Sequence, residues 1–178
     1  MKLIFLDIDG VLNNMYTDEN TPDGFVGIST TLNERLGKII DSDPEEIEVV
    51  LSSSWKIMTD DMPDYTYMME KLREVNAEPV GITEEPDEKG MLRGQGIKQY
   101  LDEAEDVTGY VILDDYMFDF KEAGLIPHLV LTDEVVGLTM EDALIAIDIL
   151  NGSLLPEDYY DDIDKERGYY RDFEETEE

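Results

Sequence analysis

Residues 3–12 constrain the fold more than any other part of the chain, because an apolar run there ends in two aspartates and a glycine. The segment reads LIFLDIDGVL, and its apolar part has the length and composition of a buried strand. Residues two apart in a strand point to the same side. Asp7 and Asp9 are therefore predicted to emerge together at the carboxyl end, where open α/β sheets hold their sites. Two such carboxylates repel, so they require a cation or a shared proton.

The Asp-x-Asp spacing by itself is common in an acidic chain, and it occurs at two other places. Asp41 and Asp43 end a helical pattern, whereas Asp162 and Asp164 lie in a charged tail. Only the first pair follows an apolar run and precedes a glycine. We therefore interpret that pair as functional and the others as surface charge.

Predicted strands alternate with predicted helices along most of the chain. The strands cover residues 2–7, 47–51, 78–82, 110–113 and 128–131, and the helices cover 31–41, 65–76, 96–106 and 140–150. This alternation predicts an α/β fold with a doubly wound, Rossmann-like parallel sheet. Ser29 or Thr30, Asp64 and Thr139 are the expected helix caps.

The chain is expected to form one domain over residues 1–155, followed by an acidic, tyrosine-rich tail over 156–178. A polar loop at 13–27 is predicted to be a short flap over the site, and neither it nor the later polar loop has the length of a large cap domain. The tail is expected to be a solvated, partly disordered segment, and anchoring by its tyrosines is the alternative.

Composition excludes several classes of function. The formal net charge of −32 disfavours generic binding to a nucleic-acid backbone and fits a very soluble, a salt-adapted or a nucleic-acid-mimicking protein. The chain has no cysteine, which excludes disulfides and thiolate chemistry. The single histidine, His128, opens an apolar strand and is expected to be structural. We expect no signal peptide and no membrane span, and therefore a cytoplasmic protein.

Two windows, 49–59 and 89–101, contain no acidic residue. Their cations are Lys56, Lys89, Arg93 and Lys98. In so acidic a chain such windows favour an anion pocket, with chance or core burial as the alternative. The sequence RGQG at 93–96 lacks the third glycine and the preceding strand of a dinucleotide loop. We interpret it as a helix start, with Arg93 before the helix and Lys98 within it.

Two further strands end in polar side chains. Ser52 and Ser53 follow the strand at 47–51 and are candidates to bind a phosphoryl group through hydroxyls and adjacent amides, although a serine-rich turn would look the same. Asp114 and Asp115 follow the strand at 110–113, and their oxygens suit a hard cation such as Mg²⁺.

In this order, the motifs resemble those of the haloacid dehalogenase (HAD) superfamily of phosphohydrolases. The resemblance covers about residues 2–150 and is strongest in DIDGV at 7–11. LSSSW at 51–55, RG at 93–94, ILDD at 112–115 and GLT at 137–139 are similar to a small subgroup seen as the phosphatase domain of multidomain RNA-repair proteins.

The resemblance implies a role for each matching residue. Asp7 would be the nucleophile that forms an aspartyl-phosphate, and Asp9 would protonate the leaving group and then activate water. Ser52 would bind the phosphoryl group, and Arg93 or Lys98 would neutralise it. The superfamily usually has lysine at this third position, so the two cations remain alternatives.

The resemblance also implies a metal site. Asp7, the backbone carbonyl of Asp9 and Asp114 would hold Mg²⁺, with Asp115 assisting. A carboxylate attacks a phosphate dianion poorly because both are negative, and Mg²⁺ together with a cationic side chain removes that repulsion.

The expected function is a Mg²⁺-dependent phosphomonoester hydrolase. Its candidate substrates are nucleotides, nucleic-acid terminal phosphates and small phosphorylated metabolites, and no membrane partner is expected. The alternatives are a small-metabolite phosphatase of the same superfamily and a non-enzymatic acidic protein, either a phospho-acceptor or a decoy.

Overall fold

The centre of the molecule is a five-stranded parallel sheet in a computed structural model that describes residues 1–162. Its strands are β1 (Lys2–Leu6), β2 (Ile47–Leu51), β3 (Pro79–Ile82), β4 (Gly109–Asp114) and β5 (Leu129–Leu131). They lie in the order β3-β2-β1-β4-β5, all parallel. The prediction of a doubly wound α/β fold is confirmed. The strand order reverses at β1, and a sheet of this kind opens a crevice where the order reverses, here beyond β1 and β4.

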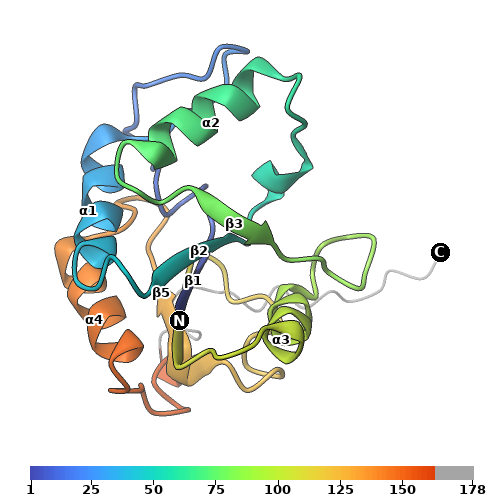
Figure 1. Cartoon of the computed structure of the whole chain (residues 1–178), viewed down its shortest axis with the longest axis vertical. Helices are drawn as coiled ribbons and strands as arrows, with labels where there is room; N and C mark the ends of the chain where they lie inside the picture. Colours follow the sequence, from blue (N-terminus) through green and yellow to red (C-terminus); the bar gives the residue numbers. More distant parts are fainter. Residues whose placement is uncertain (163–178) are drawn as a thin grey trace.

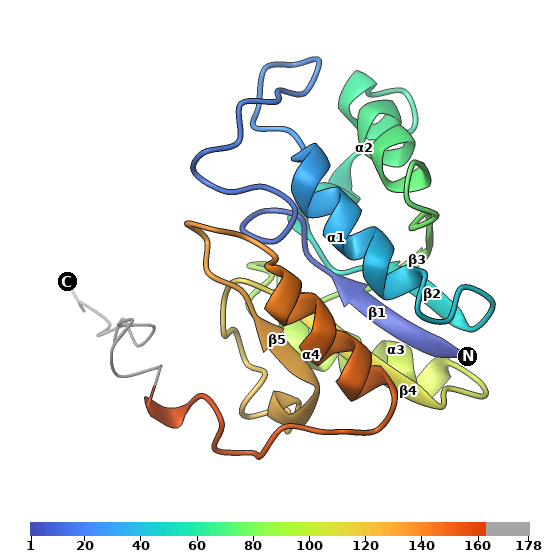
Figure 2. The ribbon, with the colours of Figure 1, turned by 90° about the vertical axis from the view of Figure 1, so that its left-hand side faces the viewer.

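Helices cover both faces of the sheet (Figures 1 and 2). They are α1 (Thr30–Ile40), α2 (Pro63–Arg73), α3 (Arg93–Glu103) and α4 (Met140–Leu150), with short 3₁₀ turns η1 (Ser54–Ile57) and η2 (Ile126–His128). Figure 2 shows α1 and α4 side by side over one face, with α3 behind the sheet. No helix within residues 1–162 is long and apolar enough to cross a membrane.

Alternate residues of β1 pack into two separate apolar cores, one on each face of the sheet, because successive side chains of a strand point to opposite faces. Ile4 and Leu6 pack into the core that α1, α2 and α4 share. Leu3 and Phe5 pack into the core that contains Ile97 of α3. Because β1 is buried on both faces, the strand is held rigidly, and so is the segment that follows it.

Two of the three expected helix caps are confirmed. Ser29 accepts a hydrogen bond from the Leu32 amide at the start of α1, and Thr139 forms a capping box at the start of α4. The prediction for Asp64 is wrong, because the N-cap of α2 is Met62 and Pro63 is the first helical residue. Pro63 suits that position, since its missing N–H would have no partner there.

Asp64 instead fastens the loop between β1 and α1. Its carboxylate accepts hydrogen bonds from Thr21 Oγ1 at 2.8 Å and from the Asp23 amide at 3.0 Å. Tyr67 Oη further along α2 accepts one from the Ile28 amide at 2.9 Å. Figure 2 shows this loop, in blue, beside α2. This loop is therefore held against α2, and residues 1–162 include no large cap domain.

The first residues of the predicted tail pack against the sheet. Tyr160 is buried, and its hydroxyl accepts from the Leu131 amide at 3.0 Å and donates to the Leu129 carbonyl at 2.8 Å. These two bonds satisfy backbone groups on the outer edge of β5. The rest of the predicted tail, 163–178, lies outside the described residues.

His128 has the structural surroundings that its position in the sequence indicated. It ends η2 immediately before β5, so the strand begins one residue later than predicted. Its ring stacks on Tyr110 at 3.8 Å between centroids, and Nδ1 lies 2.9 Å from the Tyr110 carbonyl. Burial lowers the pKa of His128.

Candidate active site

Strand register brings three of the predicted residues to one level. Leu6 of β1 lies between Leu51 of β2 and Leu113 of β4, so the residues that follow them, Asp7, Ser52 and Asp114, end three neighbouring strands together. The Asp7 amide donates to the Leu113 carbonyl at 2.9 Å, and the Ser52 amide donates to the Leu6 carbonyl at 2.8 Å. This level is the carboxyl edge at which the strand order reverses.

Three carboxylates meet there. Asp7, Asp114 and Asp115 each offer an oxygen, and these oxygens lie within 4.8 Å of one another. Asp7 and Asp114 are buried, at 6% and 1% exposure. Burial raises the pKa of Asp7. Burial, and to a smaller extent the negative charge of Asp7, raises the pKa of Asp114. The same two causes raise the pKa of Asp115 to about 7. The cluster therefore favours any cation that removes this repulsion.

Gly10 allows Asp115 to approach the cluster. A Cβ at this position would lie 2.1 Å from Asp115 Oδ2, and Gly10 has φ +73°, a conformation that residues with a side chain rarely adopt. Its carbonyl accepts a hydrogen bond from Thr132 Oγ1 at 2.8 Å. The glycine after the two aspartates is therefore needed for two reasons: it adopts the positive φ, and it leaves room for the Asp115 side chain.

Arg93 joins two of the carboxylates. Its Nη1 lies 2.9 Å from Asp7 Oδ2 and 2.6 Å from Asp114 Oδ2, and its guanidinium lies 4.1 Å from the centroid of the Phe118 ring. Burial opposes the charge, but the carboxylates of Asp114 and Asp7 raise the pKa of Arg93. Its Nε is buried and has no hydrogen-bond partner among residues 1–162.

The expected placement of Arg93 needs one correction. Arg93 is the first residue of α3, not part of the loop before it. The helix starts three residues earlier than the apolar pattern indicated, and the carboxylate of Asp119 stabilises that start. It accepts hydrogen bonds from the amides of Gly94 at 2.6 Å and Gln95 at 3.1 Å. A Cβ on Gly94 would lie 2.9 Å from Asp119 Oδ1, so this glycine permits the close approach.

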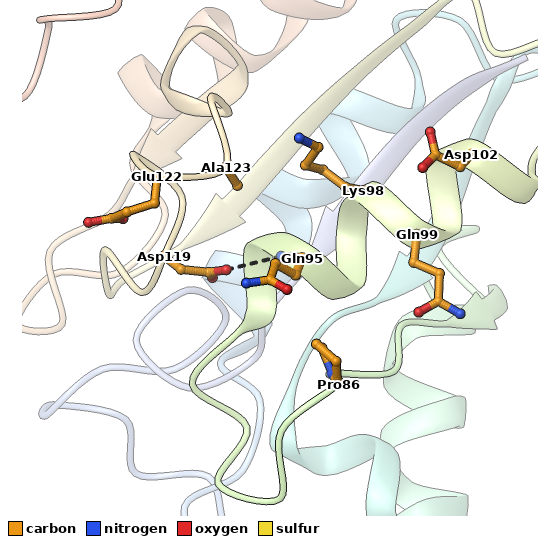
Figure 3. Close-up of a pocket in the computed structure, with 8 residues that line it drawn as sticks. All are labelled: Pro86, Gln95, Lys98, Gln99, Asp102, Asp119, Glu122 and Ala123. Atoms are coloured by element: carbon orange, nitrogen blue, oxygen red, sulfur yellow. Dashed lines mark hydrogen bonds between the residues drawn. The ribbon is translucent and has the colours of Figure 1, made fainter.

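Lys98 lies in a different groove, between α3 and the segment after β4 (Figure 3). The groove is lined by Pro86, Gln95, Lys98, Gln99, Asp102, Asp119, Glu122 and Ala123. Within residues 1–162, Arg93 alone forms ion pairs with Asp7 and Asp114. Of the two cations proposed for the third motif, the structure brings Arg93 into the carboxylate cluster and leaves Lys98 outside.

Neither of the other two cations of the acid-free windows forms an ion pair with the carboxylate cluster within residues 1–162. Lys56 is paired with Glu85 at 2.6 Å and lies 3.3 Å from Thr83 Oγ1, while Lys89 is exposed. Ser52, Ser53, Trp55 and Ile97 within the windows are buried, so burial is the alternative reason for their lack of acids.

The two serines after β2 have different partners. Ser52 is buried, and its Oγ accepts a hydrogen bond from Thr83 Oγ1 at 3.3 Å. Ser53 caps η1 by accepting from the Trp55 amide at 3.3 Å, and its hydroxyl is hydrogen-bonded to Asp7, which lowers the pKa of that carboxyl against the larger effect of burial. Both hydroxyls lie at the carboxyl edge of β2.

Asp9 is held apart from the three-carboxylate cluster. Its Oδ1 accepts from Asn13 Nδ2 at 2.9 Å, and its Oδ2 accepts from Trp55 Nε1 at 3.0 Å. Asn13 also accepts from the Gly10 amide at 3.0 Å through its Oδ1, so one side chain fixes both Asp9 and the turn that carries it. Neither partner of Asp9 was predicted from the sequence, although the tryptophan of the LSSSW motif was a signal.

Comparison with known families agrees with this geometry. Residues 3–143 match the family described as the HAD domain in Swiss Army Knife RNA repair proteins. The chain belongs to this family. No curated protein and no solved structure gives a significant match.

Membership makes this HAD domain a phosphohydrolase-type enzyme with a phosphorylated substrate, in a family that generally uses a divalent metal. The donor set fits such an ion. Three carboxylates facing one guanidinium leave two formal negative charges, and all three offer hard oxygen ligands.

Proposed function

We propose that this HAD domain is a Mg²⁺-dependent phosphomonoesterase that works through an aspartyl-phosphate. The observation that carries the proposal is the meeting of three carboxylates and one buried guanidinium at the switch point of the sheet. A decoy would not need this concentration of charge at one buried point, and a phospho-acceptor that does not turn over would not need a fixed acid–base group such as Asp9.

In the first step, an Asp7 carboxylate oxygen attacks the phosphorus atom, and the bond from phosphorus to the leaving oxygen breaks. Asp9 gives that oxygen its proton and becomes a carboxylate. Asp9 suits this part because Asn13 and Trp55 hold it beside, and not within, the cluster. Arg93, Ser52 and Ser53 are assigned to the phosphoryl oxygens, with the guanidinium of Arg93 as the cation.

In the second step, Asp9 takes a proton from a water molecule while that water's oxygen attacks the phosphorus. The bond between phosphorus and the Asp7 oxygen breaks, which releases inorganic phosphate and regenerates the Asp7 carboxylate. Asp9 is then protonated again, so a second turnover can begin.

Asp7, Asp114, Asp115 and the backbone carbonyl of Asp9 are the proposed ligands of Mg²⁺. The ion would supply charge that lets an anionic nucleophile approach an anionic phosphate and that stabilises the equatorial oxygens.

Nucleotides and nucleic-acid terminal phosphates are the proposed substrates. The absence of a large cap within residues 1–162 leaves the edge of the sheet open to a phosphate carried by a larger molecule. Because the net charge of −32 repels polyanions, such an end would be held locally and with strong salt dependence.

The test is phosphate release from 3′- and 5′-phosphorylated oligonucleotides, mononucleotides and sugar phosphates, with Mg²⁺ and with excess EDTA. Acid-quenched enzyme is then analysed by peptide mass spectrometry. An Asp9→Asn variant given p-nitrophenyl phosphate, whose acidic leaving group departs without a general acid, should carry one phosphoryl group on Asp7, because it lacks the base for the second step. Turnover that survives exhaustive chelation, or phosphate carried by another residue, would reject the proposed mechanism.

A further inference from the structure

An apolar pocket lies directly beside Asp9. It has a volume of about 560 Å³ and lies between the loop that follows β1 and the segment that follows β2. Its lining residues are Asp9, Thr21, Asp23, Phe25, Val26, Ser54, Trp55, Ile57, Met58, Met62 and Asp64. No part of the phosphoryl chemistry described above uses this space.

The apolar walls of the pocket are unusually open to solvent. Phe25 is 68% exposed, Ile57 is 78%, Val26 is 48% and Met62 is 42%. Large apolar side chains that face one cavity from two separate segments mark a binding site more often than scattered surface residues do. The flap half of the wall is also prearranged, because Asp64 holds Thr21 and Asp23.

The position of the pocket identifies which part of a substrate would enter it. Trp55 lines the pocket and donates its Nε1 hydrogen to Asp9 Oδ2 at 3.0 Å. If Asp9 protonates the leaving oxygen, the group attached to that oxygen extends away from Asp7, on the Asp9 side. The pocket therefore adjoins the leaving group and not the phosphoryl group.

The polar groups of the pocket indicate which kind of leaving group it can bind. Its charged side chains are all carboxylates, namely Asp9, Asp23 and Asp64, so a second phosphate would be repelled. Carboxylates accept hydrogen bonds from N–H groups, and the apolar walls suit a flat ring. Asp9 and Asp64 already accept hydrogen bonds from the protein, so Asp23 is the carboxylate that a plain hydrocarbon chain would leave unmatched.

We infer that this pocket binds the nucleobase of the nucleoside that leaves when the terminal phosphate is hydrolysed. The inference rests on the proposed phosphatase function for the identity of the leaving group. Phe25 and Ile57 would contact the faces of the base, while Asp23 would accept from its N–H groups. Phe25 and Ile57 then determine substrate specificity without touching the phosphorus.

The chain offers a direct probe of this binding, because Trp55 is its only tryptophan and lines the pocket. Tryptophan fluorescence is titrated with adenosine, an uncharged nucleoside, and with ribose as the ligand without a base. A Phe25→Ala/Ile57→Ala double variant removes both exposed walls. Tyr16→Ala is the matched control, since Tyr16 is 76% exposed in the same loop and does not line the pocket.

The expected result is saturable quenching by adenosine and none by ribose. Base stacking is strong enough that the double variant should bind adenosine about fivefold more weakly or worse, whereas Tyr16→Ala should match the wild type. The ratio of kcat/KM for adenosine monophosphate to that for ribose 5-phosphate should fall by a similar factor in the double variant.

The two proposals fail in different ways. Equal responses to adenosine and ribose, or unchanged adenosine binding in the double variant, would overturn the nucleobase pocket even if the enzyme releases phosphate. Equal kcat/KM for the two phosphate esters in the wild type would overturn it as well. Saturable quenching without any phosphate release would support the pocket as a nucleoside site and contradict the phosphatase proposal.

Discussion

Arg93 and Lys98 lie five positions apart on α3, yet their surroundings are opposite in kind. Five residues correspond to a rotation of about 140° around a helix, so the two side chains leave it in different directions. Arg93 enters the buried cluster of Asp7 and Asp114. Lys98 enters the open groove that it shares with Asp102 and Glu122 (Figure 3).

The two regions differ in how far water reaches their charged groups. In the buried cluster little water screens the charges, so each carboxylate alters the pKa of its neighbours and each ion pair is strong. Charges in the open groove are hydrated, and ion pairs of that kind contribute little. Chemistry that requires a perturbed carboxylate and a fixed cation is therefore expected in the cluster, and the groove supplies matched controls.

The largest expected contrast is between Asp7→Asn and Asp102→Asn. Loss of the nucleophile should lower kcat by at least about a thousandfold, equivalent to about 4 kcal/mol of barrier. Asp102→Asn, in the groove, should stay within about twofold of the wild type. Phosphate release measures both, and circular dichroism checks the fold. Retention of more than about a tenth of the activity by Asp7→Asn would remove the cluster from the mechanism.

Exchanging the cations for alanine gives the next contrast. Arg93→Ala should lower kcat/KM by about a hundredfold, as for loss of one charged stabiliser of the transition state, whereas Lys98→Ala should change it by less than about twofold. Arg93→Lys keeps the charge and controls for the exposure of unpaired carboxylates. If Lys98→Ala is the more damaging variant, the groove and not the cluster contains the third-motif cation.

Metal binding should distinguish the two regions without any turnover. At a hundredfold excess over its Kd, Mg²⁺ should stabilise the wild type by about 2.7 kcal/mol, observed as a higher Tm by calorimetry. Asp115→Asn should abolish most of that increase, because Asp115 belongs to the cluster. Glu122→Gln, in the groove, should retain it. An equal Mg²⁺ effect in both variants would point to nonspecific screening.

Asp119 connects the two regions, since it lines the groove and also caps the helix that begins with Arg93. Asp119→Ala should cost about 1 kcal/mol of unfolding free energy, as other lost N-caps do. As a positioning residue it should also raise KM more than it lowers kcat, whereas Asp119→Asn, which keeps an acceptor, should restore much of both. A stability loss with unchanged kinetics would confine Asp119 to a structural role.

The fold was predictable because local patterns determine it. The apolar runs at 2–7 and 47–51 match β1 and β2 to within a residue, and a parallel sheet follows from their alternation with helices. The strands also fix where the motifs end, so the approach of Asp7, Ser52 and Asp114 follows from register alone. The catalytic roles of these residues remain predictions.

Contacts between distant residues could not be predicted in this way. Asp119 lies 25 positions from the Gly94 amide that it caps, Trp55 lies 46 from Asp9, and Asp64 lies 43 from Thr21. Each of these side chains forms a hydrogen bond with a group far away in the sequence, and local sequence periodicity carries no information about such pairs. Asp64 is an example, because its position just before the helix predicted at 65–76 indicated a cap.

The smallest expected effect is that of salt on stability, which distinguishes repulsion between surface charges from repulsion within the cluster. The net charge of −32 implies self-repulsion, and at about 0.5 M NaCl the screening length falls to about 4 Å. Salt should therefore raise the Tm of the metal-free wild type by a few degrees. Because mobile ions screen exposed charges more than buried ones, Asp7→Asn should show the same increase within about 1 °C. An unchanged or lower Tm would mean that surface repulsion is not limiting, and a smaller increase in Asp7→Asn would mean that salt acts through the cluster itself.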